Sequence, residues 1–334
     1  MRRWFFVALF IVLLGLLVTS VTFNYMLGSR RLDQFAEAVG ASKALRYRET
    51  VFRPASNEKE RIAMISLAGV ISESERGPLS DNMVFDLIHA FRQATEDPTI
   101  KAVVLRIDSP GGEVTASDTI YSQLKRLRTK KPVVISMGAS AASGAYYAAC
   151  GGSYLIANES TTTGSIGVIV SIMNYKDLMG KAGLRSMVFK SGQYKDILSG
   201  ARDMTQQEQD YMDLMVTQAY ERFAMVVAEE RKLSKISLKE KVGDGRIISG
   251  RDALVLKLVD ANGTLEDAID KAAELAGLTA PGVVHYTAPQ GFFPRVPFFS
   301  ANSGDGSVDL KLEVIPGPKI EAGKVYLLPA FLAH

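Results

Sequence analysis

One serine stands among unusually small residues in the segment SMGASAASGAYYAACGG, residues 136 to 152. Small side chains leave the backbone open to another molecule, and a helix-like run begins at Gly144, directly after Ser143. The first turn of a helix presents unpaired N–H groups and a partial positive charge, which suit a negative charge developing on oxygen. Ser143 is therefore a candidate nucleophile. By itself, the segment fits equally well a helix N-cap among residues that allow tight helix packing.

A pair of glycines supplies a second candidate element. The segment DSPGG spans residues 108 to 112, and adjacent glycines let a backbone approach a substrate closely and leave its N–H groups free. Gly111 and Gly112 are thus candidates for an oxyanion hole, which stabilises charge that appears only in the transition state. In isolation, the simpler interpretation of this motif is a turn.

A serine nucleophile needs a base, and the chain has three histidines. His89 falls on the polar face of a predicted helix, whereas His285 and His334 belong to the C-terminal region. A Ser-Lys pair is therefore the natural alternative to a Ser-His-Asp triad. The segment FKSGQYKDILSG offers Lys190 and Lys195, and burial among apolar neighbours would favour the uncharged amine that a base requires. Sequence spacing does not choose between these two lysines.

Strands and helices alternate around these candidates. Short apolar, β-branched runs predict buried strands at 62–71, 101–108 and 132–138. The residues between them show helical periodicity, so the region predicts right-handed β-α-β units on a mainly parallel sheet. The glycine loop and the serine segment each follow a strand, and parallel neighbouring strands would bring both to the same edge of the sheet.

Further elements are predicted downstream. We expect short strands near 166–172 and 186–190. The sequence TQQE, from Thr205, fits a capping box that starts a long helix ending at about Arg231. A last helix is expected over 265–277, closed by Gly277.

The N-terminus has the pattern of a membrane anchor. Residues 4–21 carry no charge and follow Arg2 and Arg3, and at about 1.5 Å per residue such a helix crosses a hydrocarbon layer of about 30 Å. We favour an uncleaved anchor over a signal peptide, because the apolar run exceeds an h-region and no A-x-A site follows it. The short basic N-terminal flank favours an N-terminus inside the cell.

The organisation expected along the chain is an anchor at 1–28, a stalk or linker at 29–60, a catalytic domain at 61–277 and a weakly structured tail at 278–334. The net charge of +3 is spread among nearly equal numbers of acidic and basic residues, so no basic stripe suggests nucleic acid. Cys150 is the only cysteine, which excludes an intrachain disulfide.

Five segments occur in the order found in the signal peptide peptidase A family, over roughly residues 60 to 275. They are LRIDSPGG (105–112), SMGASAASGAYYAA (136–149), TGSIGV (163–168), KSGQYKD (190–196) and GRIISGRDALVLKLVD (245–260). The chain resembles the short, single-domain bacterial form of this membrane-anchored serine protease. The resemblance implies an α/β fold of the Clp protease/crotonase type, with repeated β-β-α units and a mainly parallel sheet behind one transmembrane helix.

The resemblance also implies roles for individual residues. Ser143 would be the nucleophile and Lys195 the general base, with Ser165 bonded to the lysine amine. Gly112, together with Gly111, would supply the oxyanion N–H groups. The family forms a dome-like homo-oligomer in which the serine and the lysine of one site come from neighbouring subunits, and it needs no metal or other cofactor.

The implied substrate is the signal peptide left in the membrane after preprotein cleavage. We then expect a single-pass protein of the bacterial inner membrane, with its catalytic domain on the extracytoplasmic side and no nucleic-acid partner. Three alternatives stay open: a related membrane serine protease acting in membrane-protein quality control, a crotonase-type acyl-CoA enzyme, and a non-catalytic scaffold.

Overall fold

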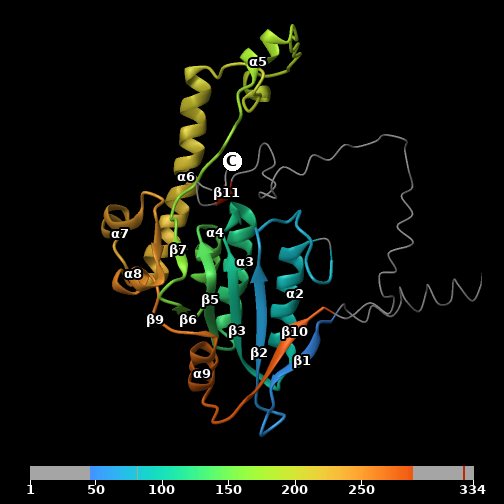
Figure 1. Ribbon diagram of the computed structural model, residues 1–334, viewed down its shortest axis with the longest axis vertical. Helices are drawn as coiled ribbons and strands as arrows, with labels where there is room; N and C mark the ends of the chain where they lie inside the picture. The colour runs from blue at the N-terminus through green and yellow to red at the C-terminus, as the bar shows by residue number, and fades with distance from the viewer. Residues whose placement is uncertain (1–45, 81, 289–325, 328–334) are drawn as a thin grey trace, which may run out of the picture. The chain divides into compact units, whose positions relative to one another are not determined.

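The computed structural model describes residues 46–80, 82–288 and 326–327 (Figure 1). In this part of the chain, the centre is a nine-stranded sheet. The strands of its main path follow one another in the order β1 (Arg48–Arg53), β10 (Gly282–Thr287), β2 (Arg61–Ala68), β3 (Ile100–Ser109), β5 (Val133–Ala142), β6 (Tyr154–Ala157) and β9 (Ala261–Asn262). Two strands lie off this path: β7 (Thr162–Gly164) pairs with β5 and with β8 (Ile247–Ser249).

Neighbouring strands are parallel from β10 through β9, and β7 is also parallel to β5. The pairs β1–β10 and β7–β8 are antiparallel. The predicted mainly parallel sheet is therefore confirmed, as are the three strands expected at 62–71, 101–108 and 132–138, with small shifts at their ends.

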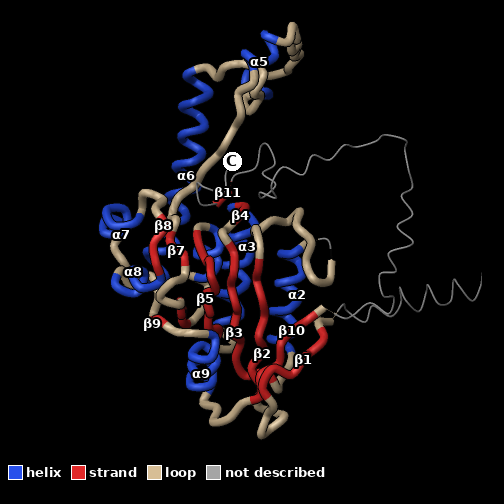
Figure 2. The backbone as a smooth tube through the Cα atoms, viewed as in Figure 1, coloured by secondary structure: helices blue, strands red, loops and turns tan. Residues whose placement is uncertain are grey.

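Helices cover the two faces of the sheet (Figures 1 and 2). On one face lie α2 (Met83–Glu96), α3 (Val114–Arg128) and α4 (Gly144–Ala149), which pack with part of α6 (Gln206–Arg231) on one large apolar core. On the other face, α9 (Leu265–Ala276) buries Ala268, Ile269 and Ala272 against alternate residues of the strands, such as Val104 of β3. This alternation explains why the central strands read as continuous apolar runs.

The predicted helix starts and stops are confirmed in two places. Thr205 and Glu208 form a capping box at the start of α6, which ends at Arg231. Helix α9 is followed by Gly277 in the left-handed conformation, as expected for a C-cap glycine. Of the short helices, α7 (Lys235–Val242) packs beside α6, and α8 (Gly250–Val255) packs beside β8.

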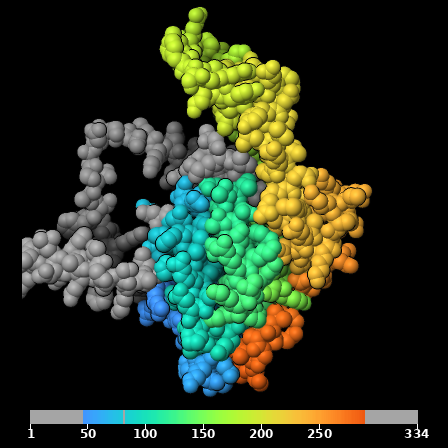
Figure 3. Space-filling model, turned by 180° about the vertical axis from the view of Figure 1, so that it is seen from behind, coloured from blue at the N-terminus to red at the C-terminus, as the bar shows by residue number. Residues whose placement is uncertain are grey.

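The strands expected near 166–172 and 186–190 are wrong. Residues 170–205 instead form loops, α5 (Lys176–Lys181) and the 3-10 helix η1 (Gln193–Asp196). With the start of α6 they project from the body as an arm, most of which is loop (Figures 1, 2 and 3). In the second of these segments the apolar side chains are exposed, Met187 to 79% and Phe189 to 92%, so the apolar pattern there marks a surface. In the first segment, Ile166 is buried although it is not in a strand.

The sheet extends beyond the domain boundaries expected at 61 and 277. β1 lies in the segment expected to be a stalk, β10 lies in the segment expected to be a tail, and the two pair with each other. Tyr47 stacks on Tyr286 with ring centroids 6.0 Å apart, so both ends contribute to the core. The predicted anchor at 1–28 lies outside the described residues, and none of the helices within them is long and apolar enough to span a membrane.

Candidate active site

Ser143 lies at a sharp corner between β5 and α4. The strand ends at Ala142, the helix begins at Gly144, and Ser143 has φ 52° and ψ −120°. A non-glycine residue in this backbone region is strained and is held there by its surroundings. Here the Ser143 N–H donates to the Gly164 carbonyl at 2.8 Å, and the Ser143 carbonyl accepts from the Tyr147 N–H at 2.9 Å. Such strained strand-to-helix corners hold nucleophilic serines in hydrolases.

The Ser143 hydroxyl is fully buried and has no hydrogen-bond partner among the described residues. A buried polar group normally finds a partner, and an orphan in a native structure calls for an explanation such as a reactive role. The corner thus presents a buried hydroxyl that is not hydrogen-bonded to the described residues.

Ser165 lies beside this corner. Strand β7 runs parallel to the end of β5 with Ala142 opposite Gly164, so the residues that follow, Ser143 and Ser165, are neighbours. Ser165 is 3% exposed and, like Ser143, has a positive φ, 50°. The other two non-glycine residues with positive φ in the described ranges, Lys232 and Lys257, follow helices α6 and α8. The two non-glycine residues with positive φ in the described ranges that do not follow the end of a helix are therefore the two serines.

The glycine loop after β3 lies at the same edge of the sheet, since Ser109 pairs with Ala141. Gly111 has φ 110°, which favours glycine, and its N–H donates to the Ser109 hydroxyl at 3.1 Å. At Gly112 a Cβ atom would lie 1.9 Å from the Ile71 carbonyl oxygen, so no side chain fits. The Gly111 N–H is therefore used within the loop, so of the two candidate oxyanion donors Gly112 is the one whose N–H is not bonded to the loop's own side chains.

The backbone at Gly112 also accepts a strand. Gly112 and Glu113 form β4, which pairs antiparallel with β11 (Tyr326–Leu327) in a separate two-stranded sheet, with Leu327 opposite Gly112. An extended chain can therefore lie along this edge through backbone hydrogen bonds. This is the way many proteins bind peptides.

Two tyrosines fix helix α4 behind Ser143, which sequence reasoning did not assign. The Tyr146 hydroxyl donates to the Leu258 carbonyl at 2.7 Å, and burial raises its pKa well above the usual value. The Tyr147 hydroxyl donates to Asp118 of α3, whose carboxylate also pairs with Arg222 of α6 at 3.1 Å. The sequence AYY after the serine is the signal that could have predicted these hydrogen bonds, because the hydroxyl of a buried tyrosine needs a hydrogen-bond partner.

The two candidate lysines differ in their surroundings. Lys190 donates to the Gln193 carbonyl at 2.9 Å and pairs with Asp196 at 2.7 Å, so its amine is already engaged within the arm. Lys195 lies in η1, is exposed, and forms no ion pair with a described residue. Of the two, Lys195 is the one without a charged partner among the described residues.

The structure brings Ser143, Ser165 and the glycine loop together, whereas Lys195 lies on the arm. Side-chain hydrogen bonds formed by arm residues stay within the arm and the first turns of α6: Gln193 donates to Gln207 at 3.0 Å, and Arg202 pairs with Asp196 at 2.7 Å and with Glu208 at 2.6 Å. Figure 3 shows the arm standing clear of the body. Within one copy, the lysine is not part of the site at Ser143.

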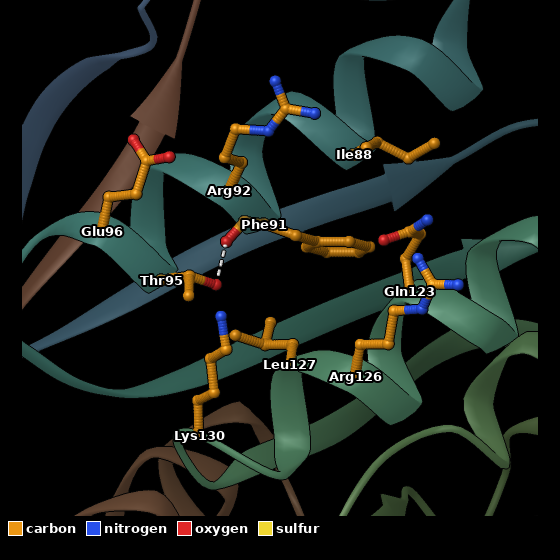
Figure 4. Close-up of a pocket in the computed structure, with 9 residues that line it drawn as sticks. All are labelled: Ile88, Phe91, Arg92, Thr95, Glu96, Gln123, Arg126, Leu127 and Lys130. Atoms are coloured by element: carbon orange, nitrogen blue, oxygen red, sulfur yellow. Dashed lines mark hydrogen bonds between the residues drawn. The ribbon is translucent and has the colours of Figure 1, made fainter.

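One other pocket carries no comparable nucleophile. A pocket between α2 and α3 has Phe91 and Leu127 at its base and the exposed cations Arg92, Arg126 and Lys130 around it (Figure 4). It holds no serine or cysteine nucleophile. In the described ranges, no group of three or more His, Cys, Asp or Glu residues could hold a metal ion.

The parallel sheet and the serine corner at its edge define an α/β fold of the Clp protease type, and a Clp protease family model matches residues 74–161. The model of peptidase family S49 matches residues 125–279. The chain is 39% identical over 235 residues to a provisionally named protease of Methanocaldococcus jannaschii, covering 70% of this chain and 74% of that protein. The chain belongs to peptidase family S49.

Two further relatives carry more specific names. A protein of Enterococcus faecium with the provisional name signal peptide peptidase SppA is 32% identical over 295 residues, 85% of this chain and 84% of that protein. Protease 4 of Salmonella typhi is 33% identical over 331 residues, 91% of this chain and 52% of that protein. These relatives confirm the family resemblance predicted from the five segments.

Proposed function

We propose that this S49 peptidase is a serine endopeptidase whose active site forms between two copies of the chain. Ser143 is the nucleophile and Lys195 of a neighbouring subunit is the general base. The observation that supports this most directly is the separation of the two groups. The buried Ser143 hydroxyl lacks a partner, and the unpaired Lys195 amine lies on a projecting arm.

The reaction follows from the groups at the corner. The uncharged Lys195 amine takes the proton from the Ser143 hydroxyl as its oxygen attacks the peptide carbonyl carbon. The Gly112 N–H donates to the resulting oxyanion. When the C–N bond breaks, the lysine gives its proton to the leaving amine, and an acyl-enzyme remains. The lysine then takes a proton from a water, whose oxygen attacks the ester carbon. When the bond to the Ser143 oxygen breaks, the lysine returns that proton to the serine, and the released carboxylic acid ionises to a carboxylate. Ser165 orients the lysine amine.

The surface of the arm supports assembly. Large apolar side chains are exposed along it: Met173, Leu178, Leu184, Met187, Val188 and Phe189. An exposed apolar surface of this extent marks an interaction site. Docking the arm on another subunit would bury these side chains and remove water from the neighbourhood of Lys195, which favours the uncharged amine.

The substrate that fits best is a remnant signal peptide. A chain bound beside β4 has to be extended, as β11 is, and the small residues around Ser143 leave room for its apolar side chains. The apolar N-terminal segment would anchor the protein in the bacterial inner membrane, with the catalytic domain on the extracytoplasmic side. Such an anchor would hold the site near peptides left in the bilayer.

Mixed assemblies test the shared site. Ser143→Ala and Lys195→Ala proteins should each be inactive. Reassembled in equal amounts, they should recover about one quarter of wild-type activity, because half the nucleophiles are intact and half of those meet an intact lysine. Activity that stays at zero in verified mixed oligomers would contradict a site shared between subunits. Substantial activity of Lys195→Ala alone would contradict the assigned base.

A second measurement tests the substrate. Proteoliposomes that contain the full-length protein, either wild type or Ser143→Ala, are prepared with a labelled signal peptide and a labelled misfolded membrane protein in the same bilayer. We expect Ser143-dependent loss of the signal peptide with the membrane protein left intact. The reverse preference would favour the quality-control role.

A further inference from the structure

A second pocket lies behind the strand that carries Ser143. Its volume is about 540 Å³, within the range of small-molecule sites. It is lined by the middle of β5, the turn between β6 and β7, and the start of α9, where small and neutral residues prevail: Met137, Gly138, Ala139, Asn158, Ser160, Thr161, Thr162, Gly263, Thr264 and Leu265. Arg106 of β3 is the one charged residue in this lining.

Arg106 is held in place. Its Nη1 donates to the Ser136 hydroxyl at 2.9 Å and to the Met137 carbonyl at 3.2 Å, so the guanidinium is fixed against β5. The side chain is partly buried. Two bonds from one nitrogen leave the Nε and Nη2 hydrogens of the guanidinium for another acceptor.

No carboxylate in the described part of the chain pairs with Arg106. Asp108, two residues further along β3, accepts a hydrogen bond from the Ser140 N–H at 3.0 Å instead. Asp267, near the start of α9, accepts from the Thr264 N–H at 2.7 Å in that helix's capping box. The acidic groups nearby are thus already bonded elsewhere, and the charge of Arg106 is uncompensated.

A positioned, partly buried arginine without a counter-ion is costly unless a ligand supplies the charge. The matching ligand is a planar anion that a guanidinium can bind through two parallel hydrogen bonds, which is the geometry of a carboxylate. Hydroxyl groups of Ser160 and Thr162 lie in the same lining and can donate to its oxygens. A single positive charge in the lining favours a singly charged ligand over a phosphate dianion.

We propose that the Arg106 pocket binds the carboxylate of a short peptide. Every peptide bond that a peptidase cleaves releases such a group, and β5 runs from this pocket to Ser143 within one strand. The choice of a peptide as the source of the carboxylate rests on the proposed function. The carboxylate site itself rests on Arg106 and its cavity.

The test is calorimetric titration of the assembled full-length Ser143→Ala protein, which cannot consume the probe. N-acetyl-alanyl-leucine with a free carboxylate should bind, and its C-terminal amide should bind at least tenfold more weakly, because a charge-assisted bond is lost. Equal binding of acid and amide would overturn the proposal. If acetate binds as tightly as the peptide acid, the pocket binds small carboxylates and the proposal that its ligand is a peptide is overturned. If inorganic phosphate binds more tightly than the peptide acid, the proposal of a carboxylate ligand is overturned.

Three variants in the same background assign the site. Arg106→Gln should weaken binding of the peptide acid at least tenfold and abolish the preference for acid over amide. Ala139→Leu, which fills the cavity without touching the guanidinium, should weaken it similarly. Arg126→Gln, an exposed arginine of the α2–α3 pocket, is the matched control and should bind like the parent. If Arg106→Gln and Ala139→Leu keep full affinity in folded protein, the pocket is not the site. Because all of these proteins carry Ser143→Ala, a negative binding result would overturn the carboxylate site without contradicting the proposed catalytic mechanism.

Discussion

Ser143 and Lys195 lie in regions that are built in opposite ways. The serine corner is buried, its backbone is strained, and it is tied by backbone bonds to Gly164 on the neighbouring strand. The arm around Lys195 is exposed and is held together by side-chain ion pairs and by its own ring contact, Tyr194 on Tyr211 with centroids 5.5 Å apart. In the proposed shared site, the first region is formed within one copy, whereas the second would be completed by contact with another copy.

This difference indicates how activity could be controlled. Under the proposed mechanism, a nucleophile without its base is inert, so a single copy would not cleave peptides. Arg202 stabilises the conformation of the arm, because it bridges Asp196 of η1 and Glu208 of α6. Each region can therefore be perturbed separately, and the size of the effect should show which one was damaged.

The largest effect is expected in the buried corner. Gly112→Ala places a Cβ against the Ile71 carbonyl, which moves the N–H aimed at the oxyanion, so kcat should fall about a hundredfold or more. The measurement is steady-state cleavage of a fluorogenic peptide by oligomeric protein. Gly180→Ala in the arm, where a Cβ meets open space, is the control and should keep full activity. A Gly112→Ala enzyme with normal kcat would remove this glycine from the site.

Lowering the pH should distinguish protonation of the base from loss of structure in the arm that carries it. The Arg202 guanidinium, followed by the Thr205 N–H, lowers the pKa of Glu208 to about 2, and Arg202 together with Lys190 holds the pKa of Asp196 well below its usual range. Both carboxylates are stabilising above their unfolded values, near 4, and this contribution is lost only as the pH falls through the lowered folded values. The arm should therefore stay intact from about pH 8 to pH 5.

Activity should nevertheless fall as the pH is lowered over this range, because in the proposed mechanism the amine must be uncharged to accept the serine proton. Peptide cleavage, far-UV circular dichroism and limited proteolysis of the arm are followed together, with return to pH 8 as the control. Reversible loss of cleavage with unchanged spectra is the expected result. Proteolysis of the arm that rises in step with the loss would mean that its ion pairs, and not the base, govern the pH profile.

A smaller loss is expected when the arm is loosened. Arg202→Ala removes the bridge between η1 and α6, and misplacing the lysine should lower kcat by about tenfold. The melting temperature of the body should change little, since the bonds of Arg202 stay within the arm. Arg202→Lys should restore part of the activity. A variant whose oligomer dissociates would show instead that Arg202 acts on assembly.

The two regions also differ in how far the sequence predicts them. Small residues before Gly144, the strand at 132–138 and the glycines at 111 and 112 are local signals, and the structure places all of them at one edge of the sheet. The arm was expected to hold two strands, because Met187 and Phe189 follow an apolar pattern. Periodicity predicts that a side chain will be buried but not whether its own chain or another copy buries it.

The ends of the sheet escaped prediction for a different reason. β1 reads RETVFR, a short strand with charges at both ends, which resembles a polar linker. Its partner β10 follows more than two hundred residues later, and only tertiary pairing makes β1 a strand. Ser143 and Lys195 show the same limit: the residue types were visible in the sequence, whereas an expectation that they lie on different copies came only from the family resemblance and not from the residue pattern.

The smallest effect tests whether the corner is as rigid as its burial suggests. Tyr147→Phe removes the hydroxyl that donates to Asp118 and leaves the Asp118–Arg222 ion pair in place. Loss of one such bond costs about 1 kcal/mol, which lowers the melting temperature by roughly 2–4 °C. Because Ser143 is fixed by backbone bonds to Gly164 and Tyr147, kcat should change less than threefold by this route, roughly the effect of a few tenths of a kcal/mol on the barrier. Calorimetry and peptide cleavage on the same preparation give both values. A large drop in kcat at an unchanged melting temperature would show that the position of α4 depends on this hydroxyl, and the corner would then be as dependent on side-chain contacts as the arm is.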